Sequence, residues 1–129
     1  MANHNYTILI AEDAPSTQFL YQEEFEEAGF KVIIAGNGLQ VTAELQDEHV
    51  DLLITDIQMP DMSALELIPL VNEKYPKLPI IVVSGRYKSL EDDFLARGFK
   101  INALFLKPVN MSLIIQKVFD LLGIPNPQA

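Results

Sequence analysis

Five short runs of isoleucine, valine and leucine recur along the chain with helical patterns between them, and this alternation restricts the possible folds. The runs cover residues 6–11, 31–35, 51–55, 80–83 and 103–106. Segments such as 52–54 and 80–83 are apolar at every position, so helices must cover both faces of the sheet that they form. Strict alternation of strand and helix predicts an α/β domain with a doubly wound, five-stranded parallel sheet, (βα)5.

Helices are predicted between and after the strands from the spacing of apolar residues and from cap residues. The first helix repeats Tyr21, Phe25 and Ala28 at helical spacing and ends before Gly29, where a left-handed cap is expected. Pro69 lies about one turn into the third helix and predicts a kink there. Cap residues predict the starts of the other helices: Asn37, Ser63 with Glu66, Ser89 with Asp92, and Asn110.

Length and composition favour one cytoplasmic domain. The 129 residues suffice for one core, and we expect a domain at 1–123 followed by a frayed tail at 124–129. No apolar run is long enough to cross a bilayer, and the first residues lack the pattern of a signal peptide. The absence of cysteine excludes disulfides and thiolate catalysis. The net charge of −9 disfavours direct binding to nucleic acid or to an anionic membrane.

Polar side chains follow four of the five predicted strands. Glu12 and Asp13 come after the first strand, Asp56 after the third, Ser84 after the fourth and Lys107 after the fifth. Each residue alone has an ordinary explanation as a loop or cap residue. Doubly wound folds, however, place their sites outside the carboxyl ends of the strands, so the sequence predicts one site built from all five residues.

Three carboxylates in one cleft need a positive partner. At an effective dielectric of about 20, each pair about 4 Å apart costs on the order of 4 kcal/mol. One lysine neutralises only part of this charge, and Mg²⁺ prefers hard oxygen ligands. We therefore expect Mg²⁺ at Glu12, Asp13 and Asp56, with the backbone carbonyl of Gln58 as a further ligand.

Asp56 is the best placed of these acids for covalent chemistry. A carboxylate beside Mg²⁺ can attack a phosphoryl group and form an acyl phosphate. Such transfer depends mostly on positioning and charge neutralisation. Lys107 is expected to pair with the incoming phosphate, and the Ser84 hydroxyl to donate a hydrogen bond to it.

Four segments resemble, in order and spacing, the receiver domains of two-component response regulators of the single-domain type. They are ILIAED at 8–13, LITDIQMP at 53–60, VVSG at 82–85 and LKP at 106–108. The resemblance covers nearly the whole chain and implies a flavodoxin-like strand order, 2-1-3-4-5. It further implies a signalling switch rather than an enzyme, with Mg²⁺ as cofactor.

The resemblance also implies partners and residue roles. Asp56 would accept phosphate from a sensor histidine kinase, a phosphotransfer protein or a small phosphodonor, and Ser84 would move toward it. Gln58 and Arg86 match variable positions that tune the lifetime of the phosphate, and the Lys107-Pro108 bond resembles one that is often cis. Phosphorylation would change an output face formed by the fourth helix, fifth strand and fifth helix. Without an attached effector, output would pass to a separate protein or a second copy, unless the chain is a piece of a larger protein.

Some positions depart from the family pattern, mostly near that output face. Relatives usually carry an aromatic residue three positions before the lysine, where this chain has Leu104. Phe105 is adjacent, but a shift of one residue puts it on the opposite face of the sheet. The link between Gly98 and the fifth strand is longer than usual, and Ala64 replaces a common glycine.

Three other kinds of protein share features with this sequence. A phosphatase with an aspartate nucleophile usually needs a second acid two residues later, where this chain has Gln58. A pseudo-receiver scaffold is disfavoured by the full set of acids with Ser84 and Lys107. A flavodoxin-shaped binding protein would need a phosphate loop after the first strand, where the acids of AEDAP at 11–15 would repel phosphate.

The last helix has more apolar surface than one buried stripe requires. Ile114, Val118 and Leu121 form the predicted buried stripe, and Leu113 is expected to lie outside it. Three further apolar residues widen the stripe, namely Ile115, Phe119 and Leu122. This surplus motivates the hypothesis that the helix helps to form a dimer or partner surface.

Overall fold

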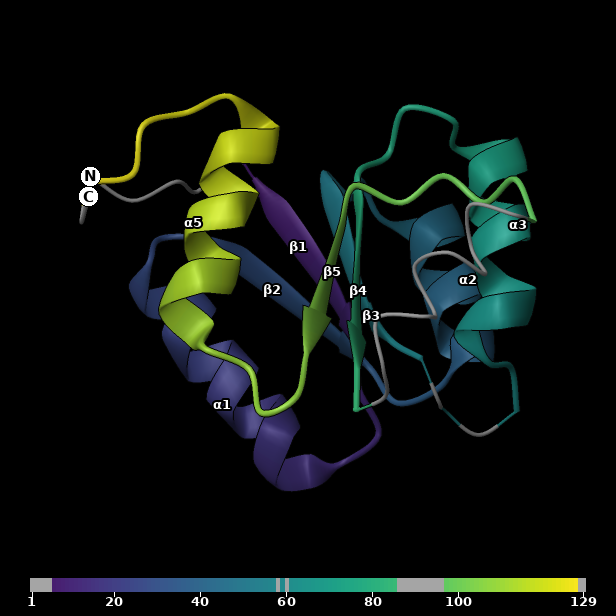
Figure 1. Cartoon of the computed structure of the whole chain (residues 1–129), viewed down its shortest axis with the longest axis horizontal. Coiled ribbons are helices and arrows are strands. Elements are labelled where there is room, and N and C mark those ends of the chain that lie inside the picture. Colours follow the sequence, from purple (N-terminus) through teal and green to yellow (C-terminus); the bar gives the residue numbers. More distant parts are fainter. Residues whose placement is uncertain (1–5, 58, 60, 86–96, 128–129) are drawn as a thin grey trace.

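Five parallel strands form a single sheet at the centre of the structure, a computed structural model in which residues 6–57, 59, 61–85 and 97–127 are described (Figure 1). The strand order is β2-β1-β3-β4-β5, and every neighbouring pair is parallel, which confirms the predicted fold. The strands are β1 (Thr7–Ala11), β2 (Lys31–Ala35), β3 (Leu52–Asp56), β4 (Ile80–Ser84) and β5 (Ala103–Leu106).

Helices cover both faces of this sheet. In Figure 1, α1 and α5 lie on one face, and α2 and α3 lie on the other. The helix predicted from Ser89 and Asp92 lies outside the described residues. No helix in the described part of the chain is long and apolar enough to span a membrane. The helices are α1 (Pro15–Glu27), α2 (Gly38–Asp47), α3 (Ala64–Lys74) and α5 (Met111–Leu122).

The cap predictions have mixed outcomes. Asn37 and Asn110 are the N-caps of α2 and α5. Each side-chain oxygen accepts a hydrogen bond from the backbone N–H three residues later. Ser63 is the N-cap of α3, but its side chain makes no capping hydrogen bond, so the predicted capping box is wrong. Gly29 has a φ of 99°, as expected for a left-handed cap. Helix α3 continues through Pro69, and the kink there stays a prediction.

Alternate residues of the buried strands supply two hydrophobic cores. Leu9 and Leu53 point to the layer of α2 and α3, whereas Ile10 and Ile54 point to the layer of α1 and α5. All residues of β1, β3 and β4 are buried, which explains why these strands lack a polar face.

The α1–α5 core contains a row of aromatic rings. The ring centroids of Tyr21 and Phe25 lie 6.1 Å apart, those of Phe25 and Phe30 lie 6.1 Å apart, and Phe30 is 5.0 Å from Phe119. Phe119 is therefore fully buried beside Ile114 and Val118, while Leu121 is only partly buried. Leu121 packs against the same core, so the predicted stripe of α5 faces the core at all three positions, with Leu121 the least buried.

The described part of the C-terminal tail lies against α5. The backbone N–H of Ile124 donates to the carbonyl of Phe119, and Asn126 Nδ2 donates to Gln116 Oε1 at 2.8 Å. Ile124 also packs against the α1–α5 core. Ile124 and Asn126 therefore contact the helix, while the division into a domain at 1–123 and a tail stays a prediction.

Gly38, the first residue of α2, leaves room for the segment that follows β3. A Cβ atom at this position would overlap the backbone carbonyl and Cβ of Met62. Alanine normally favours a helix over glycine by about 0.5–1 kcal/mol, but overpacking costs about 1–3 kcal/mol. We expect Gly38→Ala to lower the free energy of unfolding by about 1–2 kcal/mol, measured by urea denaturation.

Gly36→Ala is the matched control for this substitution. A methyl group there would meet only the ends of two flexible side chains, Gln40 at 3.3 Å and Gln18 at 3.9 Å. We expect a change within about 0.5 kcal/mol. A Gly38→Ala protein as stable as Gly36→Ala would show that Met62 moves away at no cost.

Candidate functional site

The sheet brings the five predicted site residues to its carboxyl edge. Ala11 pairs with Thr55, so Glu12 and Asp56 occupy the next positions on the neighbouring strands β1 and β3. Ser84 pairs with Leu106 on β5, and the backbone N–H of Lys107 donates to the carbonyl of Ser84 at 2.8 Å. The residues are therefore positioned by strand register and not by flexible loops.

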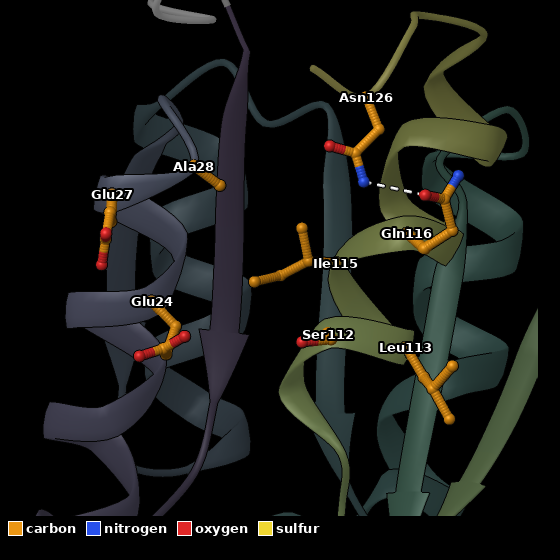
Figure 2. A pocket seen from close by; sticks show the side chains of 8 residues that line it. All are labelled: Glu24, Glu27, Ala28, Ser112, Leu113, Ile115, Gln116 and Asn126. Carbon is orange, nitrogen blue, oxygen red and sulfur yellow. Dashed lines mark hydrogen bonds between the residues drawn. The ribbon is translucent and has the colours of Figure 1, made fainter. Parts of the chain in front are cut away.

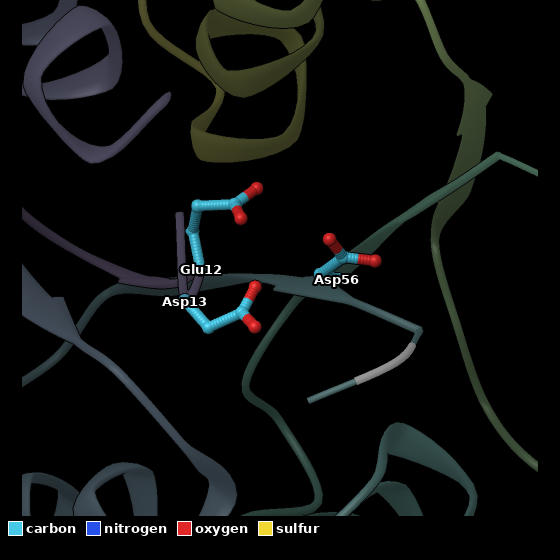
Figure 3. Close-up of side chains that lie close together, drawn as sticks. All are labelled: Glu12, Asp13 and Asp56. Carbon is cyan, nitrogen blue, oxygen red and sulfur yellow. The ribbon is translucent and has the colours of Figure 1, made fainter. Parts of the chain in front are cut away.

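Three carboxylates share one small space at this edge. One oxygen each from Glu12, Asp13 and Asp56 lies within 4.8 Å of the other two. Figure 3 shows the three side chains converging from the ends of β1 and β3. Glu12 is 2% exposed and Asp56 is 8% exposed, whereas Asp13 opens to solvent. An all-oxygen set with one exposed side suits Mg²⁺, which keeps several water ligands.

Lys107 is the positive partner of this acid cluster. Its Nζ atom lies 2.7 Å from Asp56 Oδ2 and 3.8 Å from Glu12 Oε1. Burial lowers the pKa of Lys107, but the hydrogen bond to Asp56 and the three negative charges raise the pKa more. With all groups ionised, three carboxylates and one ammonium leave a formal charge of −2, which one divalent cation balances.

Glu12 is fixed in place by its own surroundings. Its Oε2 atom accepts a hydrogen bond from the backbone N–H of Ala14 at 3.0 Å, and its backbone N–H donates to Ala35. Burial raises the pKa of Glu12, while the Ala14 hydrogen bond and the charge of Lys107 lower it in part. A proton and a cation therefore compete for this carboxylate.

Three contributors to the site escaped the sequence prediction. The Thr55 hydroxyl donates to the Asp56 carbonyl at 3.0 Å, and the Gln18 side chain donates to the Glu12 carbonyl. Tyr21 was predicted only as a core residue, yet its pKa is raised by burial and also by the charges of Glu12 and Asp56. A hydroxyl inside an apolar run was a signal for Thr55. Gln18 carried no such signal, because it is one of several polar residues on its helix.

The remaining predictions at the site have different outcomes. Ser84 is fully buried at the end of β4, and its movement toward a phosphate stays a prediction. The Lys107-Pro108 peptide bond is cis, as the resemblance implied. Leu104 packs against the α2–α3 core and Phe105 against the α1–α5 core, which confirms that they face opposite ways. Two predicted residues, Gln58 and Arg86, lie outside the described residues.

A curated relative is similar to this chain over most of the chain's length. The response regulator GtcR of Aneurinibacillus migulanus is 34% identical over 104 residues, which cover 81% of this chain and 42% of that protein. The chain spans less than half the length of the curated relatives that it matches first.

Solved structures share the fold along almost their entire length. A CheY-like response regulator receiver domain protein from Methanospirillum hungatei has a TM-score of 0.83 and 29% identity, covering 92% of this chain and 94% of that one. The response regulator TrrA of Thermotoga maritima, solved in complex with Mg²⁺-BeF, has a TM-score of 0.80 and 28% identity, with coverage of 90% and 98%.

The family model described as the response regulator receiver domain matches residues 8–119. This match includes all or most of every strand and every described helix, together with the five residues of the site. The chain therefore belongs to the response regulator receiver domain family.

Proposed function

We propose that the chain is a phosphorylation-dependent signalling switch in which Asp56 is the phosphoacceptor. The observation that carries the proposal is the convergence of three carboxylates on one lysine, which leaves an excess of negative charge at the end of β3. The donor would be a sensor histidine kinase or a phosphotransfer protein, and a small phosphodonor would serve in vitro. Glu12, Asp13 and Asp56 would hold Mg²⁺, with the Gln58 carbonyl as a further ligand.

The chemical step is an in-line transfer to the Asp56 carboxylate. One carboxylate oxygen forms a bond to phosphorus while the bond from phosphorus to the donor histidine nitrogen breaks. The electron pair of that bond stays on the imidazole, which takes up a proton. Bound Mg²⁺ would neutralise charge on the phosphoryl oxygens and screen the three carboxylates from the incoming anion.

Lys107 and Ser84 would read the new group. The Lys107 ammonium already contacts Asp56, so it would need only a short movement to pair with a phosphoryl oxygen on the same side chain. Ser84 lies beside Lys107 on the neighbouring strand and would donate its hydroxyl hydrogen to another oxygen. Gln58 and Arg86 would tune how long the acyl phosphate lasts.

The phosphorylation signal is proposed to reach its recipient through the face formed by β5, α5 and the helix predicted to begin at Ser89. Its recipient would be a separate effector protein or a second copy. The chain would act in the cytoplasm as a regulator and not as an enzyme, without direct contact to nucleic acid or membrane. The net charge of −9 supports the absence of direct contact with nucleic acid or an anionic membrane.

Acetyl phosphate provides the direct test of the switch. With Mg²⁺ present, intact-mass spectrometry should show the gain of one phosphoryl group per chain, and a chelator should prevent it. Beryllofluoride with Mg²⁺ should shift amide resonances at Asp56, Ser84 and Lys107. Steady turnover of many phosphomonoesters would instead support a phosphatase, and a protein that neither binds nor reacts would be a pseudo-receiver.

Asp13→Asn tests the metal site without removing the phosphoacceptor. Asp13 supplies one of three carboxylates, so we expect the dissociation constant for Mg²⁺ to rise at least about tenfold in isothermal titration calorimetry. Asp61→Asn is the control, because Asp61 is exposed, lies outside the acid cluster and has a φ of 71° that asparagine also adopts. Equal affinities for the two variants would contradict the proposed metal site.

A further inference from the structure

A groove of about 550 Å³ separates α1 from α5 on the outer surface of their layer. Figure 2 shows the two helices as its walls, with the C-terminal tail at one end. None of its lining residues belongs to the acid cluster, so the groove is a second feature of the molecule. The lining residues are Glu24, Glu27, Ala28, Ser112, Leu113, Ile115, Gln116 and Asn126.

The α5 side of the groove carries two apolar residues, Leu113 and Ile115, between the polar Ser112 and Gln116. Leu113 is 59% exposed, and Ile115 is partly buried and points toward α1 in Figure 2. Ala28 at the end of α1 continues this apolar surface from the other side. The excess of apolar surface on α5 noted in the sequence therefore has a definite place, which is one wall of a groove.

The α1 side of the groove is acidic. Glu24 and Glu27 lie one helical turn apart and line the groove, and Glu23 and Glu26 follow on the exposed remainder of the same helix. Within the described ranges, no salt bridge includes any of these four residues. Two carboxylates beside apolar side chains, with no salt-bridge partner in the described part of the chain, select for cations that also carry apolar groups.

We propose that this groove binds a basic amphipathic helix from a partner protein. Apolar residues of that helix would cover Leu113 and Ile115, and its lysines or arginines would pair with Glu24 and Glu27. The hydrogen bond from Asn126 to Gln116 lies at one end of the groove. The two side-chain amides there would contact the polar end of the bound helix. The proposal goes beyond the phosphoryl switch and does not depend on it.

Charge complementarity favours such a partner over a second copy of the chain. A two-fold contact places the same patch of both copies face to face. Glu24 and Glu27 of one copy would then approach those of the other without a basic residue from the groove lining between them. Like charges at short range oppose that contact, whereas a basic helix relieves the repulsion.

A designed peptide tests the proposal on the whole chain. The probe is a ~18-residue helix with leucine at positions i, i+3, i+4 and i+7 and lysine on both flanks of this stripe. A peptide of the same composition in scrambled order is the negative probe. With Mg²⁺ at saturation, binding of the ordered peptide should shift amide resonances at 24–28 and 112–116, measured by heteronuclear NMR.

Matched variants separate the groove from general charge attraction. Replacing Glu24 and Glu27 together with glutamine should weaken peptide binding by at least about tenfold in fluorescence anisotropy. Replacing Glu23 and Glu26 together removes the same charge outside the groove, and should weaken binding by less than about threefold. Leu113→Gln should also weaken binding at least about fivefold, while Leu39→Gln, an exposed leucine on α2, should not.

Several results would overturn the proposal. The proposal fails if both glutamate double variants lose peptide affinity equally, or if the scrambled peptide binds as tightly as the ordered one. Either result would show that net charge alone attracts the peptide. Shifts at Glu12, Asp13 and Asp56 in place of the groove would assign the peptide to the acid cluster. A dimer in sedimentation that Leu113→Gln dissociates would make a second copy the occupant.

Discussion

Replacing Asp56 with asparagine is expected to abolish phosphorylation of the chain by acetyl phosphate. An asparagine amide has no anionic oxygen to attack phosphorus, so the rate of acyl phosphate formation should fall at least about 100-fold, or about 2.7 kcal/mol in the barrier. Lys107 also loses its 2.7 Å ion pair with Asp56, so its ammonium is no longer held against the acceptor side chain. Intact-mass spectrometry after incubation with acetyl phosphate and Mg²⁺ measures the effect.

Asp61→Asn controls for the loss of one carboxylate near the site. Asp61 follows β3 but stays exposed and outside the acid cluster. This variant should be phosphorylated at a rate within about twofold of the wild type. Full modification of the Asp56→Asn protein, with the phosphoryl group mapped to another side chain, would show that Asp56 is not the acceptor.

Replacing Phe25 with alanine is expected to lower the free energy of unfolding by more than Gly38→Ala does. Phe25 is 0% exposed and lies between Tyr21 and Phe30 in the aromatic row of the α1–α5 core. Truncation of a buried phenylalanine costs about 3–5 kcal/mol, which is a large share of the 5–15 kcal/mol typical of a domain. Urea denaturation with circular dichroism should show a lower midpoint and an unchanged slope.

Phe19→Ala provides the same chemical change on the same helix. Phe19 is 65% exposed on α1, so its removal leaves no cavity. We expect a change in the free energy of unfolding within about 0.5 kcal/mol. If both variants lost less than about 1 kcal/mol, the row of rings would not be the main support of this layer.

The fold was predictable because buried parallel strands have an unambiguous sequence. Residues 80–83 are apolar at every position, and the structure buries the whole of β4. The strand bounds therefore agree with the predicted runs to within one residue at each end. Site residues were predictable for the same reason, since a polar residue that ends such a run must lie at the carboxyl edge of the sheet.

The errors concern contacts that depend on distant parts of the chain. Helical spacing did not show that Phe119, through its contact with Phe30, is more deeply buried than Leu121. Ser63 matched a capping box, yet the cap bond depends on a side-chain orientation that sequence spacing does not fix. Gln18 reaches the Glu12 carbonyl only because the fold brings the first turn of α1 over the end of β1.

Strand β5 has side chains in both helical layers. Leu104 packs with the α2–α3 core, Phe105 packs with the α1–α5 core, and Lys107 follows at the site. Because adjacent side chains are embedded in opposite layers, β5 cannot tilt or slide without displacing atoms in both. A displacement of Lys107 at the carboxyl end of β5 would therefore move atoms on both faces of the sheet.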